Sequence, residues 1–490
     1  MNIRNKYEHN KMTAFDKCGL QKVKKLGEGT YSIVYAVKDK NGELKALKLN
    51  NTDQSQMEES GITEISEVDV LARLRHPNLM YTDRVITSLD CEIGGFGIIL
   101  PLGASSLVDQ IKLPSYSDEE KIRHIFEIID GIAYLHSQGV LHLDLKPQNI
   151  IIDKVPNGKA IVADFGLAAY IDGPNGEITS YRESITISYR APELLTNPPW
   201  IFKASADIWS IGIIILGIFY GKSYIYSTIL KSKYDFVDWD DITDVASMYK
   251  DMFSTRREAT FKELLAKVPD KYRPSIMDLV DRCLKIDPKQ RPSAAELLQL
   301  PMFSCLQPSQ GGLTLIPNLP PKTDPIVRET VKYISLLGKK VYPDKSIRVL
   351  FLAYDIAYRA IGPFLTEKVG SLTLAVVAMW MASKLIHNYR QDESSRVSNR
   401  CRGLFGDSCI EGKDYYKSEL MIIHELKGCL YRNYLYHAAQ DMIQLTQTYQ
   451  YIVLDPTVYY VVDIPKWFEI NKPVPNATPK GLVKISEFFK

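Results

Sequence analysis

The chain has 490 residues, of which 45% are hydrophobic and 24% are charged, which is the balance of an ordinary globular protein. Its formal net charge of +2 provides no bulk electrostatic attraction, so we expect neither nucleic acid nor an anionic membrane as a partner. No signal-peptide pattern opens the chain, and the longest apolar run, residues 208–221, is shorter than the ~20 residues that span a bilayer. We therefore expect a soluble protein of the cytoplasm or nucleus. Seven scattered cysteines without a CxxC pair predict reduced thiols.

The first 105 residues are rich in strand patterns. Residues 20–50 alternate apolar and polar positions around Asn-Gly at 41–42, which is a strong signal for a hairpin between two strands. Residues 62–75 then place Val68, Leu71 and Ala72 at helical spacing. The sequence therefore predicts a separable lobe of strands with one helix.

Helical patterns dominate the rest of the chain. They run from 118 to 300, where 208–221 is apolar enough to be a buried helix, and again from 326 to 450. Residues 304–325 between these regions are rich in Pro, Gly and Gln, a linker composition. We divide the chain into an N-terminal extension (1–19), a first domain (20–303, with lobes of about 20–105 and 106–303), a linker (304–325) and a helical second domain (326–490).

The segment LGEGTYSIVY (26–35) suggests a phosphate-binding loop. Gly27 and Gly29 let the backbone approach phosphate oxygens closely, although a glycine pair in a hairpin is by itself more often only a turn. Lys48, on the next strand pattern, can reach nucleotide phosphates and needs a carboxylate to hold it; Glu67 is the candidate and Glu64 the alternative. The remaining predicted nucleotide-binding positions are Leu26, Glu28, Val34 and Ala46.

Three further motifs follow in order: HLDLKPQNI (142–150), DFG (164–166) and APE (191–193). In phosphoryl transfer Asp144 would orient and deprotonate an attacking hydroxyl, and Lys146 would neutralise the transferring group. Asn149 and Asp164 would hold Mg²⁺, which bridges phosphate oxygens. The order and spacing of the whole set make coincidence negligible.

This set of motifs resembles the eukaryotic protein kinase family over about 20–303. The resemblance implies a bilobal α+β fold, ATP and Mg²⁺ as cofactors, and protein hydroxyls as substrates. Asp207 and Arg291 match supporting positions of the family, in which Arg291 would pair with Glu193 in a structural role. Lys146 and Thr186 resemble the serine/threonine-specific members, and Thr186 is added to the predicted catalytic set.

Two features narrow the resemblance to cyclin-dependent kinases. Arg190 in YRAPE is similar to the group that contains cyclin-dependent and mitogen-activated kinases, and implies a preference for proline after the phosphoacceptor. Residues 61–78, GITEISEVDVLARLRHPN, resemble the helix through which these kinases bind a cyclin. The resemblance therefore implies that the helix at 62–75 is a control point.

The arginines that clamp a phosphate on the activation segment of these kinases, which lies between DFG and APE, are missing here. The matching positions are Ser66, Leu143 and Ala169, all uncharged. Since a phosphate orders such a segment through charge-assisted hydrogen bonds to arginines, phosphorylation near Ser180 or Tyr181 should contribute little. The active arrangement must then be stabilised in another way.

The second domain supplies a candidate for that stabilisation. SLTLAVVAMWMASKLIHNY (371–389) is apolar on nearly every face, which predicts the central helix of a bundle. Other predicted helices are 345–361 and two within 416–445 joined near 434, with a polar loop at 388–413. This succession resembles a cyclin box, although an unrelated helical bundle is the alternative.

In cyclins a lysine and a glutamate contact the kinase, and Lys384 and Glu425 match those positions. The resemblance implies an intramolecular cyclin-like domain that packs on the 62–75 helix and turns Glu67 toward Lys48. A short tether would raise the effective concentration of such a partner to roughly mM.

Two other functions stay open. A pseudokinase fused to a cyclin-like adaptor would act as a binding scaffold, supported by Leu143 and by Ser32 where a third glycine would stand. Alternatively, the kinase is active and the helical tail is a docking or homo-oligomer module, in which case Lys384→Glu would leave activity intact.

Overall fold

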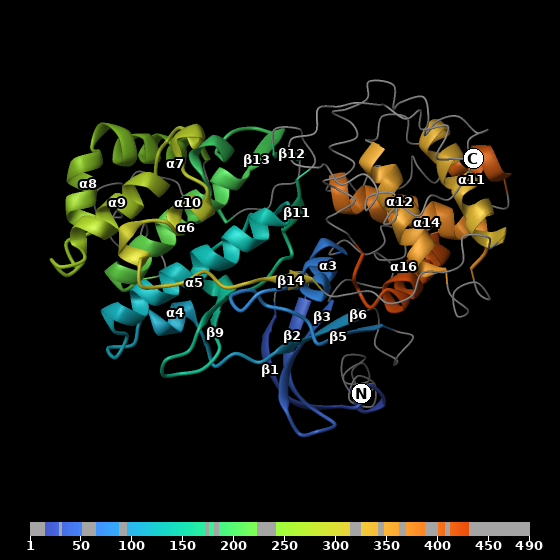
Figure 1. The fold of residues 1–490 in the computed structure, drawn as a ribbon, viewed down its shortest axis with the longest axis horizontal. Coiled ribbons are helices and arrows are strands. Elements are labelled where there is room, and N and C mark those ends of the chain that lie inside the picture. The colour runs from blue at the N-terminus through green and yellow to red at the C-terminus, as the bar shows by residue number, and fades with distance from the viewer. Residues whose placement is uncertain are drawn as a thin grey trace, which may run out of the picture.

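The computed structural model describes residues 15–28, 32–50, 65–87, 96–171, 176–180, 186–222, 242–313, 325–341, 347–361, 369–387, 400–406 and 412–430. Figure 1 shows a strand-rich lobe, a mainly helical lobe and a third group of helices beside the first lobe. The predicted Gly29, Glu64 and Tyr181 lie outside the described residues.

The first lobe is built on one antiparallel sheet with strand order β1-β2-β3-β6-β5. Its strands are β1 Leu20–Glu28, β2 Ser32–Asp39, β3 Leu44–Asn50, β5 Arg84–Thr87 and β6 Phe96–Pro101. The hairpin predicted at Asn-Gly is confirmed, because β2 and β3 pair across a turn in which Gly42 has φ 81°.

The helix predicted at 62–75 ends two residues earlier than expected. It is α3 Ile65–Arg73, and residues 62–64 lie outside the described part. Leu74 and Arg75 form strand β4, which pairs with β14 Gly312–Leu313 from the predicted linker. A strand partner that arrives from far along the chain therefore ends the helix early.

The second lobe is mainly helical. Its helices are α4 Leu107–Gln110, α5 Asp118–Ser137, α6 Ala204–Tyr220, α7 Ile242–Lys250, α8 Arg257–Leu264, α9 Arg273–Cys283 and α10 Ala294–Leu297. Its short strands are β7 Ser105–Ser106, β8 Val140–Leu141, β9 Ile150–Ile152, β10 Ala160–Val162, β11 Ala169–Tyr170, β12 Glu177–Ser180 and β13 Trp200–Lys203. Single helical turns are Pro147–Asn149, Ile187–Tyr189, Pro192–Leu194, Asp251–Thr255, Pro288–Gln290 and Pro301–Phe303.

Local sequence explains two of the long helices. Ser117 and Glu120 form a capping box at the start of α5, which satisfies backbone N–H groups that would otherwise lack partners. Helix α6 is apolar all round and nearly all of it is buried, as predicted for 208–221. Gly221 ends it in the left-handed conformation, which glycine adopts without steric cost.

The first part of the predicted linker at 304–325 is attached to both lobes. The Ser309 N–H donates to Asp130 on α5 at 2.8 Å, and the Tyr134 hydroxyl donates to the Gly312 carbonyl. The segment thus crosses from the second lobe along α5 to β4 in the first lobe (Figure 1).

The third group of helices comprises α11 Pro325–Lys340, α12 Ile347–Ala360, α14 Ser371–His387 and α16 Gly412–Glu425. The polar loop expected at 388–413 is wrong in part, because residues 400–405 are helical and α16 begins at 412. The second helix expected within 416–445 lies beyond the described residues.

These C-terminal helices pack on elements of both lobes. Helix α14 contacts α3, β11 and β12, and α16 contacts β5 (Figure 1). Their buried side chains join those of α3 and of the second lobe in one continuous apolar core. The three groups of elements are therefore held together by shared burial.

The N-terminal extension also contributes to packing. Phe15 is 1% exposed and joins Leu20, Tyr35 and Leu47 in a second core against the sheet. Cys18 is disulfide-bonded, so the expectation of reduced thiols is wrong for this residue. The other described cysteines, 283, 305, 401 and 429, carry reduced thiols, as expected.

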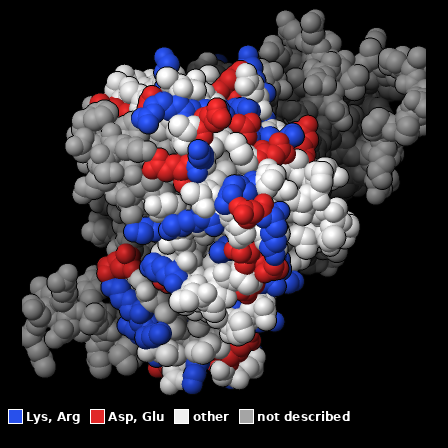
Figure 2. Space-filling view, turned by 90° about the vertical axis from the view of Figure 1, so that its left-hand side faces the viewer, with Lys and Arg blue, Asp and Glu red and all other residues white. Residues whose placement is uncertain are grey.

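None of the helices in the described part of the chain is both long and apolar enough to cross a membrane. On the face turned to the viewer in Figure 2, basic and acidic side chains are interleaved.

Candidate active site

Lys48 on β3 meets two carboxylates between the lobes. Its Nζ donates to Glu67 Oε1 at 2.6 Å and to Asp164 Oδ1 at 2.9 Å. Burial alone would lower the pKa of Lys48, but the charges of Glu67 and Asp164 outweigh it and raise that pKa, so the ammonium stays protonated. Burial would likewise raise the pKa of Asp164, yet Lys48 lowers it and the carboxylate stays ionised. The predicted Lys48–Glu67 pair is therefore formed.

Helix α3 delivers Glu67 because its apolar residues turn the helix into the core. Val68, Val70 and Leu71 are at most 1% exposed, and Glu67 itself is 2% exposed. A buried carboxylate is stable only when it is paired, and Lys48 is that partner. The position of α3 thus decides whether this ion pair forms.

The loop at 142–149 gathers the other predicted groups. Lys146 Nζ donates to Asp144 Oδ2 at 2.6 Å and to Thr186 Oγ1 at 3.0 Å. The Thr186 hydroxyl in turn donates to Asp144 Oδ1 at 2.9 Å. Asn149 Nδ2 donates to the Asp144 carbonyl at 2.8 Å and to its Oδ2 at 3.0 Å. Residues up to 42 positions apart therefore converge on one carboxylate.

Asp207 at the start of α6 fixes the backbone of the 142–149 loop. Its carboxylate accepts the backbone N–H groups of His142 and Leu143, each at 2.9 Å, and faces His136 Nε2 at 2.8 Å. Burial would raise the pKa of Asp207, but hydrogen bonding to His136 lowers it, so it stays an acceptor. The His142 ring packs against Phe165, with ring centroids 5.3 Å apart.

The predicted Glu193–Arg291 pair is formed. Arg291 makes a bidentate contact, with both N–O distances 2.8 Å. The same guanidinium donates to the carbonyls of Lys285 and Ser205, which ties the end of the activation segment to the second lobe.

The described residues of the predicted phosphate loop lie on β1 and β2. Leu26, Gly27 and Glu28 end β1, and Gly27 is paired in register with Val34. Val34 lies opposite Lys48 on β3. Ala46 is on the same strand, two residues before Lys48. These positions therefore surround the strand that carries Lys48.

A family model for the protein kinase domain matches residues 20–303. The chain belongs to the protein kinase family. The match spans both lobes and every motif above, so protein substrates and the use of ATP with a divalent metal follow from membership.

The donor set fits that cofactor pair. No group of three or more His, Cys, Asp or Glu side chains in the described ranges could hold a metal by itself. Mg²⁺ does not require one, because it usually binds through one or two carboxylates together with substrate phosphates. Asp164 and the amide oxygen of Asn149 would hold the ion, and Lys48 would meet the phosphates.

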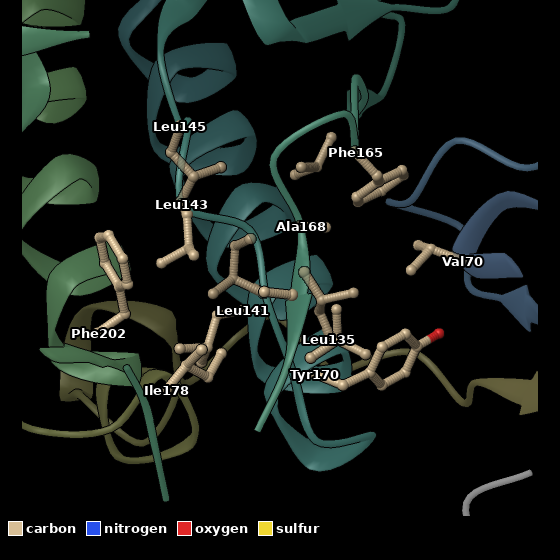
Figure 3. Close-up of a cluster of buried hydrophobic side chains, with 14 of the residues drawn as sticks. Val70, Leu135, Leu141, Leu143, Leu145, Phe165, Ala168, Tyr170, Ile178 and Phe202 are labelled. Atoms are coloured by element: carbon tan, nitrogen blue, oxygen red, sulfur yellow. The ribbon is translucent and has the colours of Figure 1, made fainter. Parts of the chain in front are cut away.

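The positions of the missing arginines are filled by packing. Leu143 is 6% exposed, Ser66 8% and Ala169 1%. Figure 3 shows Leu143 in a cluster with Leu141, on the side where Ile178 and Phe202 lie. The last two are register partners in the β12–β13 ladder. Leu143 therefore lies in an apolar cluster that includes Ile178 of the activation segment.

Lys384 on α14 meets a carboxylate of the neighbouring C-terminal helix. Its Nζ donates to Glu419 on α16, and both groups are buried. Contacts of Lys384 and Glu425 with the 62–75 helix stay predictions. Two polar contacts to α3 come from the segment after α16: the Leu430 N–H donates to Asp69 at 2.6 Å, and Cys429 Sγ lies 3.5 Å from the Ala72 carbonyl oxygen.

Sequence reasoning missed Asp69, Arg73 and Tyr170, which meet in one buried cluster. The spacing of Asp69 and Arg73 at i and i+4 was a signal for an ion pair on the helix. Nothing local indicated that Tyr170 would join them.

Proposed function

We propose that this protein is a serine/threonine kinase of the cyclin-dependent type, activated in cis by its C-terminal helices without an activation-segment phosphate. The observation that carries the transfer reaction is the convergence of Lys146, Thr186 and Asn149 on Asp144 while Lys48 is paired with Glu67. Both halves of a phosphotransfer site are therefore in place together.

The reaction follows from these positions. Asp144 accepts the proton of a substrate serine or threonine hydroxyl and orients its oxygen toward the phosphate. Lys146 supplies positive charge beside that oxygen. Thr186 accepts a hydrogen bond from the Lys146 ammonium and donates one to the Asp144 carboxylate, which fixes the two charged groups relative to each other. ATP would supply the γ-phosphoryl group and leave as ADP, and Asp164 and Asn149 would hold Mg²⁺, which would offset the phosphate charge.

Three observations support the finer assignments. Thr186 between Lys146 and Asp144 favours serine/threonine substrates. Arg190, 4% exposed beside APE, matches the proline-directed group. Helix α14 contacts α3, β11 and β12, the elements that an activating partner would need to hold.

The test uses the full chain after phosphatase treatment. We would measure transfer from Mg-ATP to peptides that contain Ser-Pro, Ser-Ala or Tyr-Pro. Asp144→Asn should lower kcat about 10²–10⁴-fold, while the exposed control Asp278→Asn should not change it.

Equal and negligible transfer by wild type and Asp144→Asn would favour the adaptor over the kinase. Strong dependence of wild-type activity on a retained phosphate would contradict activation without one. Equal rates on Ser-Pro and Ser-Ala would remove the proline preference and leave the kinase.

A further inference from the structure

The carboxylate of Asp69 joins three parts of the chain in one buried cluster. It accepts Arg73 Nε at 2.9 Å within α3, the Tyr170 hydroxyl from β11, and the Leu430 N–H at 2.6 Å from the segment after α16. Arg73 Nη2 also donates to the Tyr170 oxygen at 3.0 Å. Asp69, Arg73, Tyr170 and Leu430 are each at most 2% exposed. Because water does not reach these groups, losing one of the hydrogen bonds leaves a buried polar atom unsatisfied and destabilises the fold.

The charges of this cluster are balanced. Burial raises the pKa of Tyr170 well above its usual value, so its hydroxyl is a neutral donor to Asp69. Burial would lower the pKa of Arg73, but Tyr170 and Asp69 raise it, and the guanidinium stays charged. One buried cation therefore meets one buried anion, with a neutral hydroxyl between them.

The segment that reaches Asp69 is shaped for this approach. Lys427 N–H donates to the His424 carbonyl and Gly428 N–H to the Ile423 carbonyl, the pattern of a Schellman motif at the end of α16. Gly428 has φ 80°, and a Cβ there would lie 3.0 Å from Ala72 Cβ and 3.2 Å from Val68 Cγ1. Only glycine lets this turn lie so close to α3.

Helix α12 binds the same 428–430 turn on the side opposite to α3. Arg359 on α12 donates to the Cys429 and Leu430 carbonyls, each at 2.6 Å, and pairs with Asp355 one helical turn earlier. The Leu430 peptide is thus held between Arg359 and Asp69. A backbone segment in this position transmits the placement of the C-terminal helices to α3.

We propose that Asp69 is a positioning residue that locks α3 to β11 and to the 428–430 turn, and thereby holds Glu67 against Lys48. The proposal rests on the proposed kinase activity and names the contact through which the C-terminal helices act. Tyr170 directly follows Ala169, one of the missing arginine positions, and it links α3 to the strand after DFG. The Tyr170 hydroxyl and the 428–430 turn thus hold α3 and β11 in place, which is the effect expected of a clamped activation-segment phosphate in cyclin-dependent kinases.

The positions of Asp69 and Tyr170 explain how the cluster acts on Glu67 and on the 142–149 loop. Asp69 lies two residues after Glu67, so both belong to one turn of α3. The position of such a helix depends on its tertiary contacts, because most helical stability in proteins comes from packing of the apolar face. Tyr170 pairs in β11 with Val140 in β8, which leads directly into the 142–149 loop. Loss of the cluster therefore frees α3 from both the loop side and the C-terminal side.

The experiment compares full-chain variants by steady-state kinetics at a temperature at which circular dichroism shows each to be folded. Tyr170→Phe removes one hydroxyl, and Gly428→Val displaces the turn from the other side. Each should lower kcat about 10-fold or more, because each releases α3 from one of its two anchors and so weakens the placement of Glu67. Asp278→Asn, in an exposed i,i+4 pair with Arg282, is the matched control for Asp69→Asn and should stay at wild-type activity.

Two readouts separate positioning from mere stability. If both substitutions act through α3, the double variant should lose little more than the worse single variant, because shared partners make effects non-additive. In a Glu67→Gln background the same substitutions should have less than about a twofold effect on kcat, because the contact they serve is already lost. Additive losses that persist in Glu67→Gln would overturn the proposal.

Folded Tyr170→Phe and Asp69→Asn variants with wild-type kcat would also overturn it. Hydrogen exchange of the amides at 65–73 tests the lock without kinase activity. Faster exchange there in Gly428→Val supports the proposal even if wild type transfers no phosphate, an outcome that would remove only the proposed function. Unchanged protection of α3 overturns the proposal in either case.

Discussion

Restoring the missing arginine should damage this kinase, and Leu143→Arg tests that expectation. Leu143 is 6% exposed and packs in the cluster with Ile178 and Phe202. Removing a buried leucine forfeits about 1.5–3 kcal/mol, and overpacking by a longer side chain adds about 1–3 kcal/mol. Ser66 and Ala169, at the related positions, offer no carboxylate to pair the new charge. We expect a loss of about 3 kcal/mol or more in the free energy of unfolding.

The assay is thermal unfolding of the full chain, with urea unfolding as a check. A loss of about 3 kcal/mol should lower Tm by about 5 °C, from an unfolding entropy of about 2.1 cal/mol/K per residue over residues 20–303. Leu143→Met is the control, because a volume-conserving change should cost less than about 1.5 kcal/mol. Leu143 has φ 64°, and Arg and Met share the steric cost of that conformation, so backbone strain cancels in the comparison.

A Leu143→Arg protein as stable as Leu143→Met would refute the apolar account of this position. So would a rise in kcat that requires phosphate on the activation segment, because the arginine would then have found an anionic partner.

Other substitutions test the frame around the site. Gly311→Ala should loosen the 309–313 segment, since a Cβ there would lie 2.0 Å from Tyr134 Cε2; hydrogen exchange at Leu313 should speed up, and unchanged exchange would contradict the docking. Arg291→Lys should cost about 2–4 kcal/mol of unfolding free energy, because lysine cannot keep the bidentate contact to Glu193; a cost near zero by urea unfolding would show that the pair is dispensable. Burial raises the pKa of Glu127 to about 7, so the folded protein binds this proton more tightly than the unfolded chain. The stability that this proton confers is complete below about pH 4.5 and is lost as pH rises through 7. Glu127→Gln should therefore be more stable than wild type by about 1–3 kcal/mol at pH 8 and equal to it near pH 4.5, and a constant difference across that range would contradict the shift.

The sequence alone determined the chemistry of the site. Lys48, Asp144, Asn149 and Asp164 could be named as candidates because phosphoryl transfer requires these side chains in a short, ordered set of motifs. The Asn-Gly hairpin and the buried helix α6 were equally local, since each depends on turn chemistry or on the periodicity of apolar residues. Glu67 could be chosen over Glu64 only as a candidate, because the two lie one helical turn apart.

Tertiary structure decided what holds that chemistry in place. Helix α3 ends at Arg73 because Leu74 and Arg75 pair with β14, whose strand pattern is too short to stand out within a linker composition. Asp69 meets Leu430 across 361 positions, and Tyr170 joins them from a two-residue strand. No periodicity records such partners, since a buried polar contact is specified by which surfaces the fold brings together. The same holds for Leu143: its sequence position shows only that an arginine is absent, and its neighbours Ile178 and Phe202 show why leucine belongs there.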